Sequence, residues 1–370
     1  MRYDYFGNTS LRVKKLLYNF EIQLILFEEL FNNADEKDIW VNNSDLQIRY
    51  LELLEQHNLL ESRNKTVDLG TKDARVKSAP LEDYNLINRR QKHITQQGYE
   101  LLNLIKTQSH KIENDFLQID LISLFFLKAT LNFNDNSSLL IKYLEVFKYF
   151  NGQLSIEIFR LLPLINNFRN TQNFIESIQN NTLMSSVLHN TPHYLELEYF
   201  LNDLQNGTAK IEYFKTAKGE KTAGEIVKVL KEIFLPFRKT RNIELLHILL
   251  TSPVYANFKN LYLRYLTKRS KKEEKINELI DFCDGTLEEF GKRFFQFIFE
   301  ARIQANLNDY LDLNRRYLNL TGIFEFYKDR VDLNIIFSTL LKHSNYQGIL
   351  KQIAQSTVSQ NLLSELFNDE

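Results

Sequence analysis

Basic side chains gather in the stretch TKDARVKSAPLEDYNLI, residues 71–87, where Lys72, Arg75 and Lys77 follow one another closely. DNA carries dense negative charge, so clustered Lys and Arg on a helix attract it whatever its base sequence. Asp73 stands between two of these cations. A carboxylate there weakens a phosphate clamp, but it can accept a hydrogen bond from cytosine or orient Arg75. The stretch is predicted to be a DNA-facing helix, and a solvated charged surface is the alternative interpretation.

A polar turn with three more basic residues follows this helix. The apolar NLI and the segment KHIT flank Arg89, Arg90 and Lys92, and this pattern predicts a short two-stranded hairpin. On a hairpin beside a basic helix, the three cations are expected to contact phosphate. Thr95 is predicted to start the next helix, QQGYELLNLIK.

Two amphipathic helices are predicted before the basic one. Apolar residues recur at helical spacing over residues 11–31 and 46–60, and Ser44 or Asp45 is the expected N-cap of the second. The basic helix itself is expected over residues 74–81, interrupted near Pro80. Two helices, a basic helix and a hairpin follow the order of a winged helix.

The same order returns near the end of the sequence. A helix that carries Arg315 and Arg316 is followed by GIFEF, the charged turn YKDR and VDLN, which predicts a second basic helix with a hairpin. Earlier in this second unit, Asn151-Gly152 predicts a turn and Ser155 a helix N-cap. Two basic helices, each followed by a hairpin, favour DNA binding over an accidental charge run. Winged helices also bind proteins, so the fold alone does not fix the function.

Two further segments supply candidate phosphate contacts. The stretch GNTSLR offers cap residues and cations at the start of a helix, where free N–H groups bind phosphate. The region between about residues 170 and 251 is polar and then basic. The predicted contacts in these segments are Asn8, Thr9, Arg12, Lys14, Lys218 and Lys221.

Composition limits the class of protein. The chain has 370 residues, 44% of them apolar, which is enough for two or three domains with substantial cores. Its net charge of -1 argues against a uniformly basic nucleic-acid coat, and its single cysteine, Cys283, argues against a disulfide framework or a multi-cysteine zinc site. The sequence has neither a signal-peptide pattern nor a membrane-spanning apolar run. We therefore expect a cytoplasmic protein that does not bind a membrane.

Three segments together resemble the AlwI-type family of type IIS restriction endonucleases, which includes nicking relatives. They are YFGNTSLR, then TKDARVKSAPLEDYNLI with ITQQGYELL, and NRRYLNLTGIFEF. The resemblance covers residues 5–102 and 314–334 well and is faint between about residues 170 and 306. It implies a recognition part built from two winged-helix-like subdomains that read a short asymmetric duplex site, a helical linker, and a nuclease domain of the PD-(D/E)xK type.

The sequence departs from this family at the catalytic motif. A PD-(D/E)xK site needs carboxylates that hold Mg²⁺ and a lysine on a buried strand. The acidic-x-Lys candidates are Glu273-Glu274-Lys275, in a charged run, and Asp35-Glu36-Lys37, in a polar loop, and both are interpreted as solvated surface. We therefore expect no catalytic or metal-binding residue and no cofactor in this chain, with Mg²⁺ belonging to a nuclease domain or a partner subunit.

The predicted fold is mainly α-helical with small β-hairpin wings. Residues 1–112 form a first winged-helix-like DNA-recognition subdomain, residues 113–335 a second one with a basic insertion, and residues 336–370 the start of a helical linker. The predicted function is recognition of double-stranded DNA for a type IIS restriction or nicking enzyme. The alternatives are a protein-interaction or regulatory module with winged helices, and a nuclease with an unrecognised site.

Overall fold

The computed structural model describes residues 1–7, 16–41, 44–60, 66–133, 138–191, 195–215, 220–267 and 271–364. The chain divides into two compact units. One consists of Tyr3–Thr171 with Asp309–Glu370, and we call it the terminal unit; the other consists of Gln172–Asn308 with Met1–Arg2, and we call it the central unit. These boundaries differ from the predicted ones at residues 112 and 335, because the last part of the chain packs with the first.

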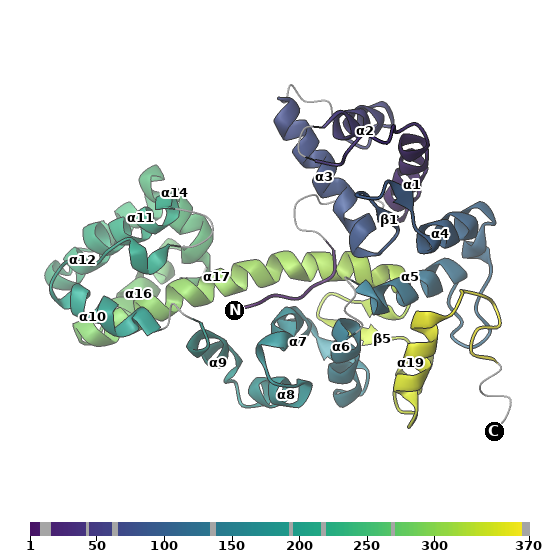
Figure 1. The fold of residues 1–370 in the computed structure, drawn as a ribbon. Helices are drawn as coiled ribbons and strands as arrows, with labels where there is room; N and C mark the ends of the chain where they lie inside the picture. The colour runs from purple at the N-terminus through teal and green to yellow at the C-terminus, as the bar shows by residue number, and fades with distance from the viewer. Residues whose placement is uncertain are drawn as a thin grey trace. The chain divides into compact units, whose positions relative to one another are not determined.

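The first half of the terminal unit is helical with one small hairpin (Figure 1). Helix α1 packs against α2, and α2 against α3. Strands β1 and β2 pair antiparallel, with Ile87 opposite Ile94 and Asn88 opposite His93. The elements are α1 Leu16–Asn32, α2 Asp45–Gln56, α3 Val67–Asp83, β1 Ile87–Asn88, β2 His93–Ile94 and α4 Gln96–Lys106. The predicted order of three helices, a hairpin and a further helix is confirmed.

Local capping explains where two of these helices begin. The Ser44 hydroxyl accepts a hydrogen bond from the Gln47 N–H at the start of α2, and the Thr95 hydroxyl accepts one from the Gly98 N–H at the start of α4. Both contacts satisfy N–H groups that have no partner inside the helix. The predicted caps are therefore confirmed.

The expected break at Pro80 does not occur, because α3 continues through this residue to Asp83. The Pro80 carbonyl still accepts the N–H of Tyr84 over 3.0 Å, so the helical ladder resumes behind the proline. Leu81 and Tyr84 are both buried. Burial of this last turn offsets the hydrogen bond that proline cannot donate.

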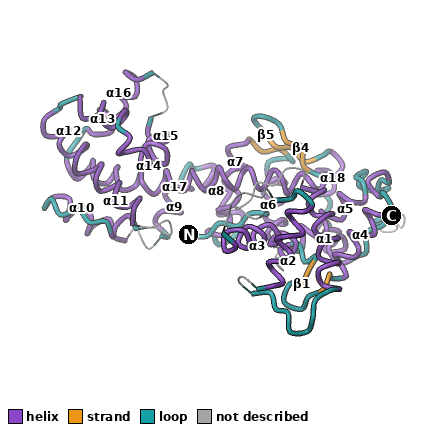
Figure 2. The backbone as a smooth tube through the Cα atoms, turned by 90° about the horizontal axis from the view of Figure 1, so that it is seen from above, coloured by secondary structure: helices purple, strands orange, loops and turns teal. Residues whose placement is uncertain are grey.

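A three-stranded antiparallel sheet joins distant parts of the terminal unit. Its strand order is β3-β5-β4, so β5 lies between the other two. The hairpin of β4 and β5, drawn in orange in Figure 2, matches the second hairpin predicted from the sequence, whereas no strand was predicted at β3. Strand β3 has three residues, and Gln153 finds its partner Asp332 at a separation of 179 residues, so no local pattern marks it. The strands are β3 Gln153–Ser155, β4 Phe324–Phe326 and β5 Arg330–Leu333.

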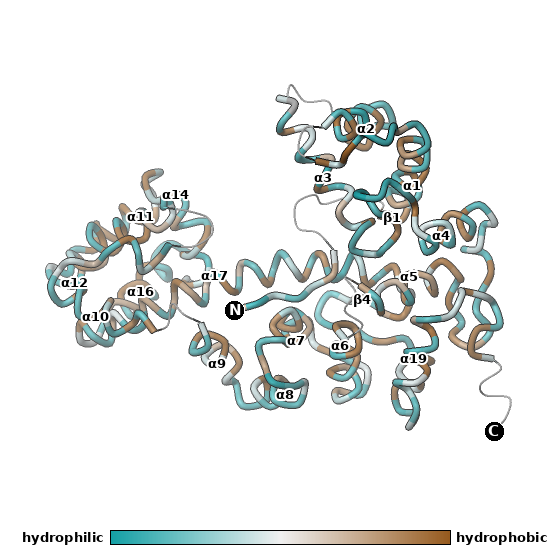
Figure 3. Tube along the Cα trace, in the orientation of Figure 1, coloured by the Kyte–Doolittle hydropathy of each residue, from teal (hydrophilic) through white to brown (hydrophobic). Residues whose placement is uncertain are grey.

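Helix α5, Leu121–Leu131, lies at the core of the terminal unit. Ten of its eleven residues are buried, and its apolar character is visible in Figure 3. A helix that is apolar all round must be covered by neighbours, and α5 packs against α4, α6 and α19. The remaining elements of this unit are η1 Ser109–Lys111, α6 Ser138–Tyr149, α7 Ile156–Leu161, η3 Leu162–Asn167, η9 Asn319–Thr321, α18 Ile335–Leu340 and α19 Tyr346–Gln355.

In its described residues the central unit is helical. Phenylalanine side chains form much of its core, and Phe234 contacts the rings of Phe258, Phe282, Phe290 and Phe294. The elements are α8 Thr171–Gln179, α9 Leu183–His189, α10 Leu197–Gln205, η5 Glu212–Phe214, α11 Glu220–Val229, η6 Leu230–Phe234, α12 Leu235–Thr240, α13 Glu244–Thr251, η7 Pro253–Tyr255, α14 Ala256–Phe258, η8 Lys259–Leu263, α15 Arg264–Leu266, α16 Lys272–Cys283 and α17 Leu287–Leu318. Helix α17 contributes its last turns to the terminal unit.

Candidate nucleic-acid interface

The four predicted contact residues of α3 differ in exposure. Lys72 is exposed, Asp73 and Arg75 are half-buried, and Lys77 is only 7% exposed. The Arg75 guanidinium donates a hydrogen bond to Gln47 on α2 over 3.0 Å. Burial lowers the pKa of Lys77 to about 8, because its charged form loses hydration. Lys72 is therefore the cation of this helix that is most accessible to a polyanion.

Arg89, in the turn after β1, is bound within the protein. Its side chain forms an ion pair with Glu82 and donates to the Ser78 hydroxyl and to the Arg75 carbonyl. Its guanidinium also lies 5.6 Å from the ring centre of Trp40. These contacts connect the hairpin to α3, so Arg89 has a structural role whether or not it meets a ligand.

The other two cations of the hairpin have different surroundings. Arg90 is exposed and forms no hydrogen bond or ion pair with any described residue. The Lys92 ammonium donates to the carbonyl oxygens of Asp35 and Glu36 over 2.5 and 3.2 Å. Arg90 is consequently the hairpin residue that is best placed to receive a phosphate without breaking an internal contact.

The last turns of α17 and the β4–β5 hairpin form a second basic surface. Arg315 is exposed, and its guanidinium carbon lies 5.7 Å from the ring centre of Phe326 on β4. Arg316 instead pairs with Asp312 one turn earlier, over 3.1 Å. In the part of the chain that the structure describes, Arg315 has no carboxylate partner. Its charge is therefore available at the surface while the aromatic ring limits its motion.

Lys328, in the turn of this hairpin, and Arg330, at the start of β5, are two further cations that were not predicted to be contacts. Lys328 is exposed, and Arg330 stands 4.6 Å from the ring centre of Tyr327 while it pairs with Asp332 over 3.0 Å. The signal was present in the charged turn YKDR. This turn predicts a hairpin, but it does not show which of its cations face a ligand.

One face of the three-stranded sheet carries two carboxylates. The side chains of Gln153, Asp332 and Glu325 align across β3, β5 and β4, and the amide of Gln153 donates to Asp332 over 3.0 Å. Glu325 and Gln153 are exposed. Asp332 is paired with Arg330, so Glu325 is the described carboxylate of this face whose charge no cation balances, and it repels a polyanion. A nucleic acid would therefore meet the turn of the hairpin and Arg315 in preference to this face of the sheet.

Three segments that are distant in sequence meet at the ring of Tyr317. The rings of Tyr317 and Tyr84 stack at 5.8 Å with an angle of 9° between their planes, and Phe20 packs edge-on against both. The Tyr317 ring also covers Gly7, where φ is +90° and an added Cβ would come within 2.1 Å of a ring carbon. The segments around Gly7, Tyr84 and Tyr317 thus share one buried aromatic cluster.

The remaining predicted contacts lie in the central unit or outside the described residues. Lys221 is exposed on the first turn of α11 in the central unit. Asn8, Thr9, Arg12, Lys14 and Lys218 lie outside the described residues.

Neither acidic-x-Lys run lies on a strand. Glu273, Glu274 and Lys275 are in the first turns of α16, and Asp35–Lys37 belong to the turn after α1. Within the described ranges, no three His, Cys, Asp or Glu side chains come together as metal ligands. These residues do not fit the strand-borne site of a PD-(D/E)xK nuclease.

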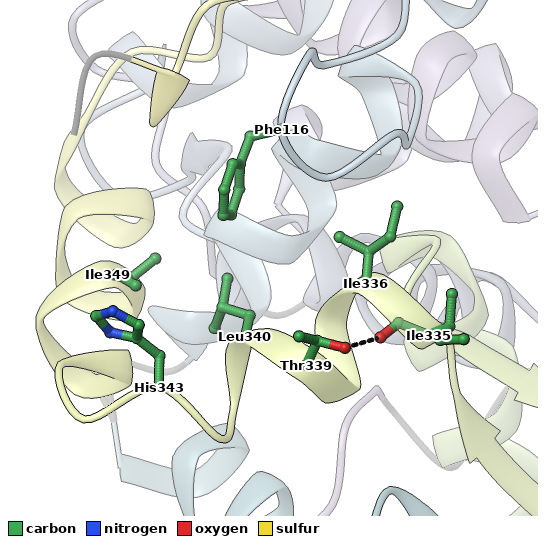
Figure 4. A pocket seen from close by; sticks show the side chains of 7 residues that line it. All are labelled: Phe116, Ile335, Ile336, Thr339, Leu340, His343 and Ile349. Atoms are coloured by element: carbon green, nitrogen blue, oxygen red, sulfur yellow. Dashed lines mark hydrogen bonds between the residues drawn. The ribbon is translucent and has the colours of Figure 1, made fainter. Parts of the chain in front are cut away.

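An apolar pocket of about 390 Å³ lies elsewhere in the terminal unit (Figure 4). Phe116, Ile336, Leu340 and Ile349 line it, and its Thr339 hydroxyl is already bonded to the Ile335 carbonyl over 2.8 Å. Ile335 borders the pocket and is 81% exposed. This surface has the apolar character of a protein or ligand contact and lacks the cations that nucleic acid requires.

Comparison with known proteins adds no assignment. No protein-family model matches the chain, and no curated protein or solved structure matches it. None of the described helices is long and apolar enough to cross a membrane.

Proposed function

We propose that this chain recognises a short asymmetric sequence in double-stranded DNA. In this proposal it is the recognition portion of a type IIS restriction or nicking endonuclease, and a nuclease domain or partner subunit supplies the Mg²⁺-dependent cleavage. Two winged-helix-like subdomains of the terminal unit carry the contacts: α3 with β1–β2, and the end of α17 with β4–β5. The single cysteine is in keeping with a reducing compartment such as the cytoplasm.

The observation that carries the proposal is the position of Arg315. It is exposed on a helix beside a hairpin, oriented by the Phe326 ring and without a carboxylate partner among the described residues. An arginine with these properties can donate two hydrogen bonds to the major-groove edge of guanine. The exposed Lys328 in the adjoining turn supplies a phosphate contact that holds the helix in register.

The first subdomain supports the proposal through Lys72 and Arg90. Both are exposed, one on α3 and one in the turn of the β1–β2 hairpin. Because Arg75 and Arg89 already donate to protein acceptors, base reading by either would require it to exchange an internal bond for one to DNA. We assign phosphate contact to Lys72 and Arg90, and base contact first to Arg315.

Selection from a library of random duplexes, with the full chain as bait, tests the proposal. We expect enrichment of one non-palindromic sequence of about 4–6 base pairs, with an affinity that falls steeply as salt rises. Absence of any enriched sequence, together with an affinity that salt does not change, would reject DNA recognition.

A second candidate function is a protein-interaction module, which the apolar pocket beside Ile335 favours. An exposed apolar surface of this kind is a common feature of protein contacts. Replacing Ile335 with Glu separates the two functions, because it should abolish a protein contact at the pocket and leave DNA affinity unchanged. Two results together would favour this second function. Duplex selection would enrich no sequence, and Ile335→Glu would abolish binding of a purified protein partner.

A further inference from the structure

A cavity of about 280 Å³ in the central unit combines an apolar lining with positive charge. Leu204, Leu235 and Leu287 supply the apolar part, and Gln205, Arg238 and Lys239 supply the polar part. Gly207 also borders the cavity, and no atom lies within 4 Å of the position that a Cβ would take there. The volume is close to the lower end of that of small-ligand pockets.

Contacts within the protein hold the Arg238 side chain in place. Its guanidinium donates to the carbonyl oxygens of Cys283 and, over 2.8 Å, of Gly285, at the end of α16. It also lies 4.8 Å from the ring centre of Phe290. Two acceptors and a ring orient this guanidinium before any ligand arrives, which lowers the entropy lost on binding.

The charge of Arg238 is not neutralised by a described carboxylate. Asp284 is nearby, but its ion pair is with Arg241, over 2.7 Å. Arg293 is a third arginine near Arg238 and Arg241, and its guanidinium donates to the Phe282 carbonyl over 3.1 Å. The pKa of Arg238 is lowered, chiefly by burial, and the positive charges of Arg241 and Arg293 act in the same direction.

Lys239 and Gln205 leave further donors at the cavity. Both side chains are exposed, and neither forms a hydrogen bond or ion pair with any described residue. An ammonium and an amide beside an oriented guanidinium together suit the oxygens of a small anion. The three leucines suit an aliphatic group attached to it.

We propose that this cavity binds a small amphiphilic carboxylate. The carboxylate lies between Arg238 and Lys239, with the Gln205 amide as an additional donor, and the aliphatic chain packs against Leu204, Leu235 and Leu287. The apolar lining distinguishes this ligand from inorganic phosphate or a DNA phosphate, which have nothing to place against leucine. The inference does not depend on DNA recognition, since it concerns residues of the central unit alone.

Calorimetric titration of the full chain with octanoate tests this site. We expect saturable binding that weakens about three- to fourfold for each methylene removed from the chain. Octylammonium, which has the same tail and the opposite charge, is expected not to bind. Equal binding of octylammonium, or displacement of octanoate by an equal concentration of inorganic phosphate, would overturn the proposal.

Two charge-reversal variants assign the binding to this cavity. Lys239→Glu should weaken octanoate binding at least about tenfold, because it places a carboxylate beside the bound anion. Lys231→Glu is the matched control: Lys231 is also exposed, lies in the preceding turn η6, and does not line the cavity. Both changes are at exposed positions, so thermal unfolding should match the wild type. Unchanged affinity in folded Lys239→Glu would reject the site.

Discussion

The main-chain N–H of Phe6 donates a hydrogen bond to Oδ1 of Asn314 over 2.9 Å, and both residues are completely buried. The amide nitrogen of Asn314 donates in turn to the Tyr143 hydroxyl over 3.3 Å, and that hydroxyl donates to the Asp4 carbonyl over 2.7 Å. One asparagine thus joins the first residues of the chain to α6 and α17. It also positions the helix turn that presents Arg315.

Replacing Asn314 with Leu should destabilise the terminal unit. The change leaves the buried Phe6 N–H without an acceptor, and an unsatisfied buried group of this kind costs about 2–3 kcal/mol. Urea unfolding measures the loss. Asn319→Leu is the control, since Asn319 is exposed in η9, directly after α17, and its replacement should change stability by less than about 0.5 kcal/mol. Equal stability of the two variants would contradict the role of Asn314.

Lys77 and Lys72 lie on one helix, and replacing each should change a different property. The Lys77 variant should change stability, and the Lys72 variant should change DNA affinity. Folding lowers the pKa of Lys77 from 10.5 to about 8, so near pH 7 most of the folded protein carries the buried charge. Lys77→Met should therefore stabilise the protein near pH 7, by about 3 kcal/mol. As pH rises from 8 towards 10.5 the unfolded chain binds more protons than the folded one, so the wild type gains stability and the difference shrinks.

Lys72→Met is the matched control for this change. Lys72 is exposed, so its replacement should leave the free energy of unfolding unchanged at either pH and lower the affinity for DNA. Lys77→Met should leave DNA affinity unchanged. The contradicting result is a stability difference between Lys77→Met and the wild type that is the same near pH 7 and near pH 10. That result would show that Lys77 does not titrate as a buried amine.

The ion pair between Glu82 and Arg89 should make stability depend on acid pH. Burial raises the pKa of Glu82, but the hydrogen bonds and charge of Arg89 outweigh it, and the pKa ends below its ordinary value of 4.5. The stabilisation is therefore present above about pH 4.5 and is lost as pH falls through the folded-state pKa. At about pH 7, Glu82→Gln should cost about 1 kcal/mol, a modest value because the pair is partly exposed.

Unfolding measured between about pH 7 and pH 3 checks this dependence. The difference between Glu82→Gln and the wild type should vanish at the acid end, where both side chains are neutral. Lys72→Met is the control, because Lys72 is exposed on the same helix as Glu82 and is not among the groups that shift the pKa of Glu82. If Glu82→Gln still lowered the free energy of unfolding at the acid end, the loss would come from packing and not from the ion pair.

Arg315 and Arg316 should differ in their effect on DNA recognition. Arg315→Ala should lower the discrimination between the selected duplex and a scrambled one by about 1–3 kcal/mol, the value of a bidentate arginine–guanine contact. Arg316→Ala should change it less, because Arg316 is paired with Asp312. Lys328→Ala should weaken both duplexes equally and reduce the salt slope by about one. Competition binding that finds the Arg315 and Arg316 variants equal would contradict this assignment.

Features that depend on neighbouring residues were predictable from the sequence. Ser44 and Thr95 cap their helices as expected, and Ser155 caps α7 by accepting the Ile158 N–H over 3.3 Å. Both hairpins lie where charged turns separate short apolar runs. Each of these signals depends only on residues within a few positions, so it does not depend on how the rest of the chain folds.

The candidate site could be predicted only in part, because the exposure of each cation depends on tertiary contacts. A sequence shows that Lys72 and Lys77 are basic, but exposure depends on which face of α3 meets the core, and the core includes residues from distant segments. Arg89 could not be distinguished from Arg90, since its partners Glu82 and Ser78 become neighbours only when the hairpin folds back on α3.

The sequence by itself determined the helical class, the helix caps, the two hairpins and the positions of the basic residues along the chain. The tertiary structure decided the division into units, the third strand β3 and which cations face solvent. These depend on contacts such as Phe6 with Asn314, at a separation of 308 residues, and Gln153 with Asp332, at 179. Such contacts are selected by the burial of a whole core, and no local pattern of residues encodes them.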